Sequence, residues 1–166
     1  DVAFNMMPPA FESGIADYCT MFEPVASEYQ AQGKGYIVAS VGQESGEIPY
    51  TCFMAKQSYI NKNGEAVDAL LKAVTRAVKY INETDSDTVA GYLTKYFDGT
   101  SKTSIKMSLD SYKSIDAWVT NMAMKEAAFN KLQDVIELAG ELDGRVKFGD
   151  VVITDAAQRI YEEIYK

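Results

Sequence analysis

The sequence of 166 residues contains no histidine. Histidine is the commonest general base and a frequent zinc ligand, so its absence removes every catalytic triad and metal site that needs an imidazole. No apolar run approaches the roughly 20 residues that a membrane-spanning helix requires. These absences count against imidazole catalysis and against a transmembrane segment.

Positive charge is also scarce, with 16 basic residues against 24 acidic ones and a net charge of −8. A surface this negative repels phosphate backbones and anionic lipid, so no nucleic-acid partner is expected. Apolar residues make up 47% and charged residues 24%, as in an ordinary folded protein. This composition excludes a disordered tail, a collagen-like repeat and a coiled coil.

Cysteine is limited to Cys19 and Cys52, each within an apolar run. Two thiols allow either a disulfide or two free side chains that pack as small hydrophobic groups, and the free state is the simpler interpretation. Without His and without a Cys-x-x-Cys pair, no metal site is expected. No other cofactor is expected either.

Proline is confined to the first 49 positions, at Pro8, Pro9, Pro24 and Pro49. The front of the chain therefore predicts short elements with sharp turns, and the rest predicts helices. Apolar runs at 2–7, 15–22, 36–41 and 50–54 indicate strands, with helices at 8–13 and 25–32 between them. Strands that alternate with helices predict an α/β fold with a parallel or mixed sheet.

Helical periodicity dominates the remainder of the chain. One apolar stripe covers 65–82, and a second covers 85–97 with Ser86 or Asp87 as its cap. Further helices are predicted after Ser101, between 118 and Gly140, and after Thr154-Asp155.

Glu23 is the first candidate for a specific polar contact, because it ends a predicted strand immediately before Pro24. Ligands of open α/β sheets gather outside the carboxyl ends of strands, where a carboxylate accepts hydrogen bonds from an amine or amidine. Glu23 equally suits a cap for the following helix, since acidic groups favour helix N-termini. The sequence leaves both interpretations open.

Two other segments suit a small-molecule site. Met6-Met7 precedes a helix N-terminus that begins at Pro8-Pro9, although ordinary packing explains these Met side chains as well. Residues 42–50 form a polar, Gly-containing loop that ends in Tyr50 and is able to close over a ligand or to serve as a plain connection.

Residues 8–24 combine a helix ending at Gly14, a hydrophobic residue, Asp17, an apolar strand and Glu23-Pro24. This order resembles a stretch in solute-binding proteins of ABC transporters, in the nitrate/sulfonate/taurine and thiamine-precursor (SsuA/THI5-like) group. Asp17 stands one position later than in the commoner order. The resemblance continues through Gly35-Tyr36-Ile37-Val38, Pro49, Glu65-Ala66-Val67 and Gly140-Glu141-Leu142, and so covers nearly the whole chain.

The resemblance implies a periplasmic-binding-protein type 2 fold, with two α/β lobes around a ligand cleft. It implies that the chain is the C-terminal part of such a protein, with residues 1–33 ending lobe two and 34–166 completing lobe one. It further implies secretion, a lipid anchor in a Gram-positive source, delivery of ligand to a membrane permease, and no catalysis. Because such a part leaves apolar faces uncovered, we expect it to associate with another chain or with the missing N-terminal half.

Under this resemblance, Glu23, Met7, Phe11 and Tyr50 are expected to form one wall of the cleft. An acidic residue there favours a ligand with hydrogen-bond donors, such as an aminopyrimidine thiamine precursor. Two alternatives remain: a pyrimidine-precursor synthase of the same fold, which depends on His, and a helical protein-interaction domain.

Overall fold

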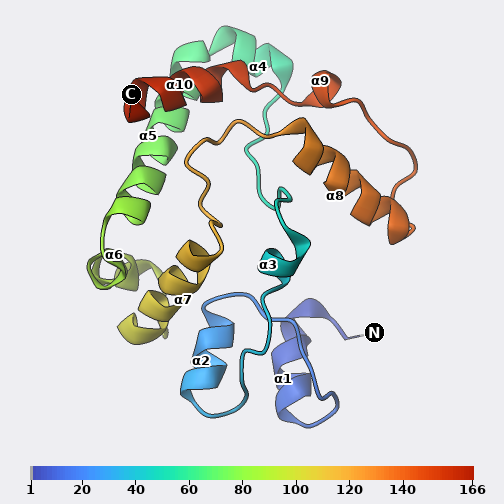
Figure 1. Cartoon of the computed structure of the whole chain (residues 1–166), viewed down its shortest axis with the longest axis vertical. Coiled ribbons are helices and arrows are strands. Elements are labelled where there is room, and N and C mark those ends of the chain that lie inside the picture. Colours follow the sequence, from blue (N-terminus) through green and yellow to red (C-terminus); the bar gives the residue numbers. More distant parts are fainter. Residues whose placement is uncertain (1) are drawn as a thin grey trace. The chain divides into compact units, whose positions relative to one another are not determined.

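A computed structural model describes residues 2–166, whose secondary structure is helical (Figure 1). The chain divides into two compact units. The first comprises Asp1–Ser40 and Thr84–Ile115, and the second comprises Val41–Glu83 and Asp116–Lys166. Each unit is built from two separate stretches of sequence, so each depends on contacts between distant residues.

The first unit is organised around the pair of helices α6 and α7 (Figure 1). Their buried residues include Val89, Ala90, Ile105 and Leu109, each at most 3% exposed. The helices of this unit are η1 (Phe4–Met6), α1 (Met7–Glu12), α2 (Val25–Ala31), α6 (Ser86–Leu93), η2 (Thr94–Tyr96) and α7 (Lys102–Ser114).

Side-chain caps fix where α6 and α7 begin. Asp85 Oδ1 accepts a hydrogen bond from the Thr88 N–H at 2.9 Å, and Ser101 Oγ accepts one from the Ser104 N–H at 3.0 Å. Each cap satisfies a backbone donor that the first turn of a helix leaves unpaired. The cap predicted at Ser101 is confirmed, whereas the cap of α6 is Asp85 rather than Ser86 or Asp87.

The second unit contains the longest helix, α5, which packs against the C-terminal helix α10 (Figure 1). Ile160 is fully buried, and Asp68–Arg159 and Lys72–Glu163 form ion pairs at 2.7 Å. The ion pairs ascend together along both helices, so α5 and α10 run in the same direction. The helices of this unit are α3 (Val41–Ser45), α4 (Gln57–Lys62), α5 (Gly64–Glu83), α8 (Glu126–Leu138), α9 (Phe148–Val151) and α10 (Asp155–Tyr165).

The predicted helices are largely confirmed, with one shortened at its start and three short ones missed. α8 begins at Glu126, so residues 118–125, which the prediction included, lie outside the observed helix. Gly14 and Gly140 adopt positive φ angles of 78° and 74° just beyond α1 and α8, as their predicted stop role requires. The sequence pattern missed α3, α4 and α9, which are too short to show a helical period.

The predicted strands are wrong for the described residues 2–166, which contain none. Part of 2–7 is the 3-10 helix η1, and 15–22, 36–40 and 50–54 are irregular connections. The physical reason is that a strand exists only through hydrogen bonds to a neighbouring strand, whereas a helix satisfies its backbone internally. The structure brings no ladder partner to these segments, so the sheet of the expected α/β fold is absent from residues 2–166.

Both thiols are free in the structure. Cys19 is half-buried and Cys52 is exposed, so the packing role expected for a free cysteine is wrong for Cys52. Its run, at 50–54, has exposed side chains because no sheet covers it.

Candidate functional site

The Glu23 carboxylate is held by two donors on one of its oxygens. Oε2 accepts a hydrogen bond from the Ser27 N–H at 3.0 Å and from the Ser108 hydroxyl at 3.3 Å. Glu23 is half-buried, and Ser27 and Ser108 are buried. The side chain therefore bridges the start of α2 to α7 within the first unit.

This arrangement confirms the capping interpretation of Glu23. The Ser27 N–H belongs to the first turn of α2, where backbone donors lack an intrahelical partner. Oε1 makes no hydrogen bond with any described residue. One carboxylate oxygen is thus committed to the fold and the other remains an available acceptor. The ligand role of Glu23 stays a prediction.

A second carboxylate joins the same two helices. Glu28 Oε1 accepts a hydrogen bond from the Ser101 N–H at 3.1 Å, at the N-terminus of α7. Hydrogen bonds from the Ser104 side chain and the Ser101 backbone hold the pKa of the Glu28 carboxyl below its usual value. The sequence analysis did not predict these contacts of Glu23 and Glu28 with α7. The spacing of Ser101, Ser104 and Ser108, which places them on one helical face, was the pattern that pointed to them.

Met7 and Phe11 lie four residues apart on α1 and are both half-buried. The Phe11 ring lies against Gly35, where an added Cβ would come within 3.0 Å of Phe11 Cε1. The structure therefore brings Met7 and Phe11 onto one helix, and Phe11 serves as a packing surface for the chain that follows α2.

Glu12 connects α1 to the end of α2 through two polar contacts. The Tyr29 hydroxyl donates to Glu12 Oε2 at 3.2 Å, and Lys34 Nζ lies 2.8 Å from Glu12 Oε1. The hydrogen bond from Lys34, together with that from Tyr29, lowers the pKa of the Glu12 carboxyl. Met7, Phe11 and Glu23 are thus carried by one compact unit, through helices that contact each other by way of Glu12.

Tyr50 belongs to the second unit and is 79% exposed. The loop predicted before it is partly helical, since α3 occupies Val41–Ser45. Two lysines of the α8 region contact the end of α3 and the residues that follow it: Lys131 Nζ donates to the Ser45 carbonyl, and Lys125 Nζ lies 2.6 Å from Glu47 Oε2. The structure gathers Met7, Phe11 and Glu23 in one unit and Tyr50 in the other.

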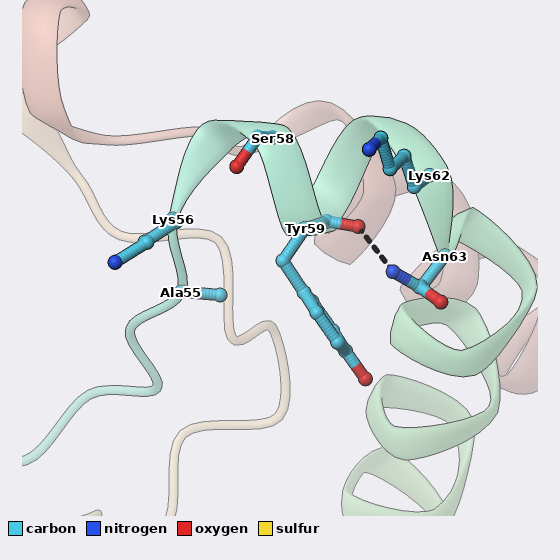
Figure 2. Close-up of a pocket in the computed structure, with 6 residues that line it drawn as sticks. All are labelled: Ala55, Lys56, Ser58, Tyr59, Lys62 and Asn63. Carbon is cyan, nitrogen blue, oxygen red and sulfur yellow. Dashed lines mark hydrogen bonds between the residues drawn. The ribbon is translucent and has the colours of Figure 1, made fainter.

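Two shallow depressions lie in the second unit, and none of the four candidate residues lines them. Figure 2 shows the first, around α4, where Asn63 Nδ2 donates to the Tyr59 carbonyl at 2.9 Å. Its lining includes Lys56 and Lys62, whose side chains are exposed rather than enclosed. The second contains Asn121 and Gln158, joined by a hydrogen bond of 2.8 Å.

Residues 2–166 provide neither a metal-binding cluster nor a membrane-spanning helix. They contain no group of three or more Cys, Asp or Glu side chains placed to hold a metal ion. Over the same residues, every helix is too short or too polar to cross a bilayer.

Comparison with known proteins places the chain in a family. Residues 1–93 match the NMT1-like family. The chain is 32% identical over 163 residues to the Bacillus subtilis (strain 168) protein named "Putative binding protein YtlA", covering 98% of this chain and 49% of that one. It thus spans about half the length of this curated relative. No solved structure matches the chain significantly. The chain belongs to the NMT1-like family, the SsuA/THI5-like solute-binding proteins that its Gly14 to Pro24 pattern resembles.

Proposed function

We propose that this chain is the C-terminal part of a two-lobed protein that captures a small molecule and delivers it to an ABC permease. Family membership and the likeness to a binding protein support the binding role. The coverage of 49% of YtlA supports a longer whole. The function proposed is binding without catalysis, in keeping with a sequence that lacks histidine.

The family implies a periplasmic-binding-protein-like fold, and we assign residues 1–33 to the end of lobe two and 34–166 to lobe one. The irregular segments at 15–22, 36–40 and 50–54 support this assignment. Their apolar, strand-forming residues have no ladder within residues 2–166, as expected where the remaining sheet belongs to sequence outside the chain.

Glu23 is the residue that we assign to direct ligand contact. Its Oε2 is fixed by Ser27 and Ser108, which orients the carboxylate before any ligand arrives and lowers the entropy cost of binding. An ionised carboxylate has no hydrogen to donate, so the ligand atom that contacts Oε1 carries a hydrogen. This favours an aminopyrimidine thiamine precursor over nitrate or a sulfonate without an amine at this position.

Met7, Phe11 and Tyr50 complete the proposed wall of the cleft. Met and aromatic side chains suit a flat ring, because they supply apolar contact beside the polar one. We further propose export of the full-length protein and a lipid anchor in a Gram-positive source, so that the cleft meets solute outside the cell.

The test uses the protein encoded by the complete reading frame and isothermal titration calorimetry. The ligands are an aminopyrimidine thiamine precursor, taurine, an aliphatic sulfonate and nitrate. We expect the aminopyrimidine to bind, and Glu23→Gln to weaken it about tenfold or more, because a charge-assisted hydrogen bond is worth roughly 1.5–3 kcal/mol.

Glu28→Gln is the matched control, since it makes the same change at a nearby carboxylate, on α2, that caps α7. We expect it to leave affinity unchanged. Binding of the aminopyrimidine that is equally strong in wild type and Glu23→Gln would remove Glu23 from the site. Binding of none of the four ligands would reject the proposed ligand classes.

A further inference from the structure

A single residue, Asn63, joins α4 to α5, and Gly64 opens the second helix. Asn63 is the only asparagine in the sequence that precedes a glycine. Asparagine is a thermolabile residue, because the backbone nitrogen of the next residue attacks its side-chain carbon in a ring closure that expels ammonia. Glycine favours this attack, since it carries no Cβ to crowd the nitrogen. The pair therefore combines the two residue types that suit the reaction best.

The attacking group, the Gly64 backbone nitrogen, is unobstructed. Its N–H forms no hydrogen bond with the described residues, as is usual at the first position of a helix. Gly64 is exposed, and a Cβ added to it would meet no atom within 4 Å. Base from the solvent therefore reaches this nitrogen.

The group under attack, the Asn63 carboxamide, is held by one hydrogen bond. Its Nδ2 donates to the Tyr59 carbonyl at 2.9 Å, and its side chain lines the shallow depression around α4 (Figure 2). Oδ1 accepts no hydrogen bond from the described residues. A single hydrogen bond contributes about 1 kcal/mol, so it restrains the carboxamide only weakly.

Ring closure also needs a rotation of the backbone between the two residues. Asn63 has a ψ angle of 38°, and its carbonyl accepts a hydrogen bond from the Val67 N–H at 3.1 Å, in the first turn of α5. Rotation about this ψ breaks that terminal hydrogen bond and leaves the rest of α5 intact. Helix ends open by fraying at little free-energy cost, so the reactive conformation is reached without global unfolding.

We propose that Asn63 is a site of spontaneous deamidation in the folded protein. The Gly64 nitrogen loses its proton to base and bonds to Asn63 Cγ, while Nδ2 takes up a proton and departs as ammonia, which leaves a cyclic succinimide. Water then opens the ring at either carbonyl. Attack at Cγ gives aspartate, and attack at the main-chain carbonyl gives isoaspartate, whose peptide bond runs through the side chain.

Both products place a carboxylate at the N-terminus of α5. Aspartate preserves the fold there, because Asp and Asn are equally good at helix N-termini and the charge interacts favourably with the helix dipole. Isoaspartate differs, since its backbone gains a methylene between the two helices and its free carboxylate replaces the carbonyl that accepts from Val67. The reaction thus changes charge and geometry at the corner between α4 and α5, next to the exposed Lys62.

The test incubates the folded protein from the complete reading frame at a series of pH values. Peptide mapping by mass spectrometry follows the exchange of NH for O at each asparagine, and an isoaspartyl methyltransferase labels isoaspartate. We expect conversion at Asn63 to exceed that at every other asparagine and to rise with pH, because the attacking nitrogen must lose its proton. We also expect the isoelectric point to shift to lower pH, since each converted chain gains an ionised carboxyl.

Asn61 is the internal control, because it is exposed and lies earlier on the same short helix, α4. The nitrogen placed to attack it belongs to Lys62, which lies inside α4 and carries a side chain. Gly64→Ala is the matched variant, since its added Cβ enters open space and alanine favours a helix. We expect it to reduce conversion at Asn63 severalfold. Equal conversion at Asn61 and Asn63 overturns the proposal, as does equal conversion in wild type and Gly64→Ala.

Urea separates reaction in the folded protein from reaction in the denatured chain. We expect the rate of conversion at Asn63 to stay nearly flat below the unfolding transition, because fraying of one helix end exposes little surface to denaturant. A rate that rises in proportion to the population of unfolded protein overturns the proposal, since the reaction would then belong to the denatured state.

Discussion

The Glu28 carboxylate of α2 accepts a hydrogen bond from the Ser101 backbone N–H, 73 residues further along the chain. An anionic group at a helix N-terminus stabilises the helix, because it accepts hydrogen bonds from unpaired backbone donors and interacts with the positive end of the helix dipole. Glu28 has this role at the start of α7. Glu23 contacts the same helix further along, where its carboxylate accepts a hydrogen bond from the Ser108 hydroxyl. Two carboxylates and the serines of α7 thus hold the front of the chain to its middle.

Replacement of Glu28 is expected to weaken this attachment. Glu28→Ala removes an acceptor from the N-terminus of α7, so we expect the free energy of unfolding to fall by about 1 kcal/mol, as for loss of a helix cap. Urea denaturation followed by circular dichroism measures the change. Glu44→Ala, on exposed α3, is the control and should have little effect; equal losses would remove the special role of Glu28.

Acid should destabilise the first unit through several carboxyls. The Ser104 hydroxyl lowers the pKa of Glu28, the Thr88 hydroxyl that of Asp85, and the Lys106 ammonium that of Asp110. A carboxyl whose pKa is lower in the folded than in the unfolded state stabilises the fold above its unfolded value and loses that effect as pH falls through the folded value.

We therefore expect stability to be flat near neutral pH and to fall below the ordinary values of 4.5 for Glu and 3.8 for Asp. Chemical denaturation at a series of pH values measures the slope. The Asp85→Asn variant should show a shallower fall than wild type, because it has one such group fewer. A steeper slope in that variant would contradict the assignment.

Tyr165→Phe is expected to leave stability unchanged or to raise it. The Tyr165 hydroxyl is buried and, among the described residues, has no hydrogen-bond partner. Burial also raises its pKa. Removal of an unsatisfied buried hydroxyl cancels a desolvation cost of about 1–3 kcal/mol, while the ring contacts with Tyr161 and Lys79 remain.

Thermal unfolding measures the effect, with Tyr161→Phe on the same helix as the control. A Tm of Tyr165→Phe that falls by several degrees would show that the hydroxyl has a partner in solution.

The Gln133 side chain is expected to hold the segment that follows α8 in place through its hydrogen bonds to Val146. Its side chain is 4% exposed, accepts from the Val146 N–H at 2.8 Å and donates to the Val146 carbonyl at 3.2 Å. Gln133→Glu keeps the acceptor but places a carboxylate oxygen against the Val146 carbonyl. We expect a loss of about 1–3 kcal/mol, since a buried group is left unsatisfied.

Hydrogen exchange at the Val146 amide, together with urea denaturation, checks this expectation. Gln158→Glu, which changes an exposed amide on α10, should cost less than Gln133→Glu. Unchanged protection at Val146 in Gln133→Glu would show that its contacts with α8 do not depend on this side chain.

The sequence by itself determined most of the helices and several of their ends. The stripe in 65–82 predicted α5, and Ser101, Gly14 and Gly140 marked helix boundaries that the structure confirms. These features are local: a helix closes its own hydrogen bonds, and a cap or a left-handed glycine acts on the adjacent turn.

Only the tertiary structure decided where Glu23 and Glu28 bind and whether the apolar runs became strands. The hydrogen-bond partner of a carboxylate is decided only when distant helices come together. The contacts of Glu23 and Glu28 with α7 could therefore not be predicted from the sequence. A strand likewise needs a neighbour, and residues such as Tyr36 and Val38 have strand-forming side chains without one. Local hydrogen bonds are encoded locally, whereas those between distant segments depend on which surfaces the fold brings together.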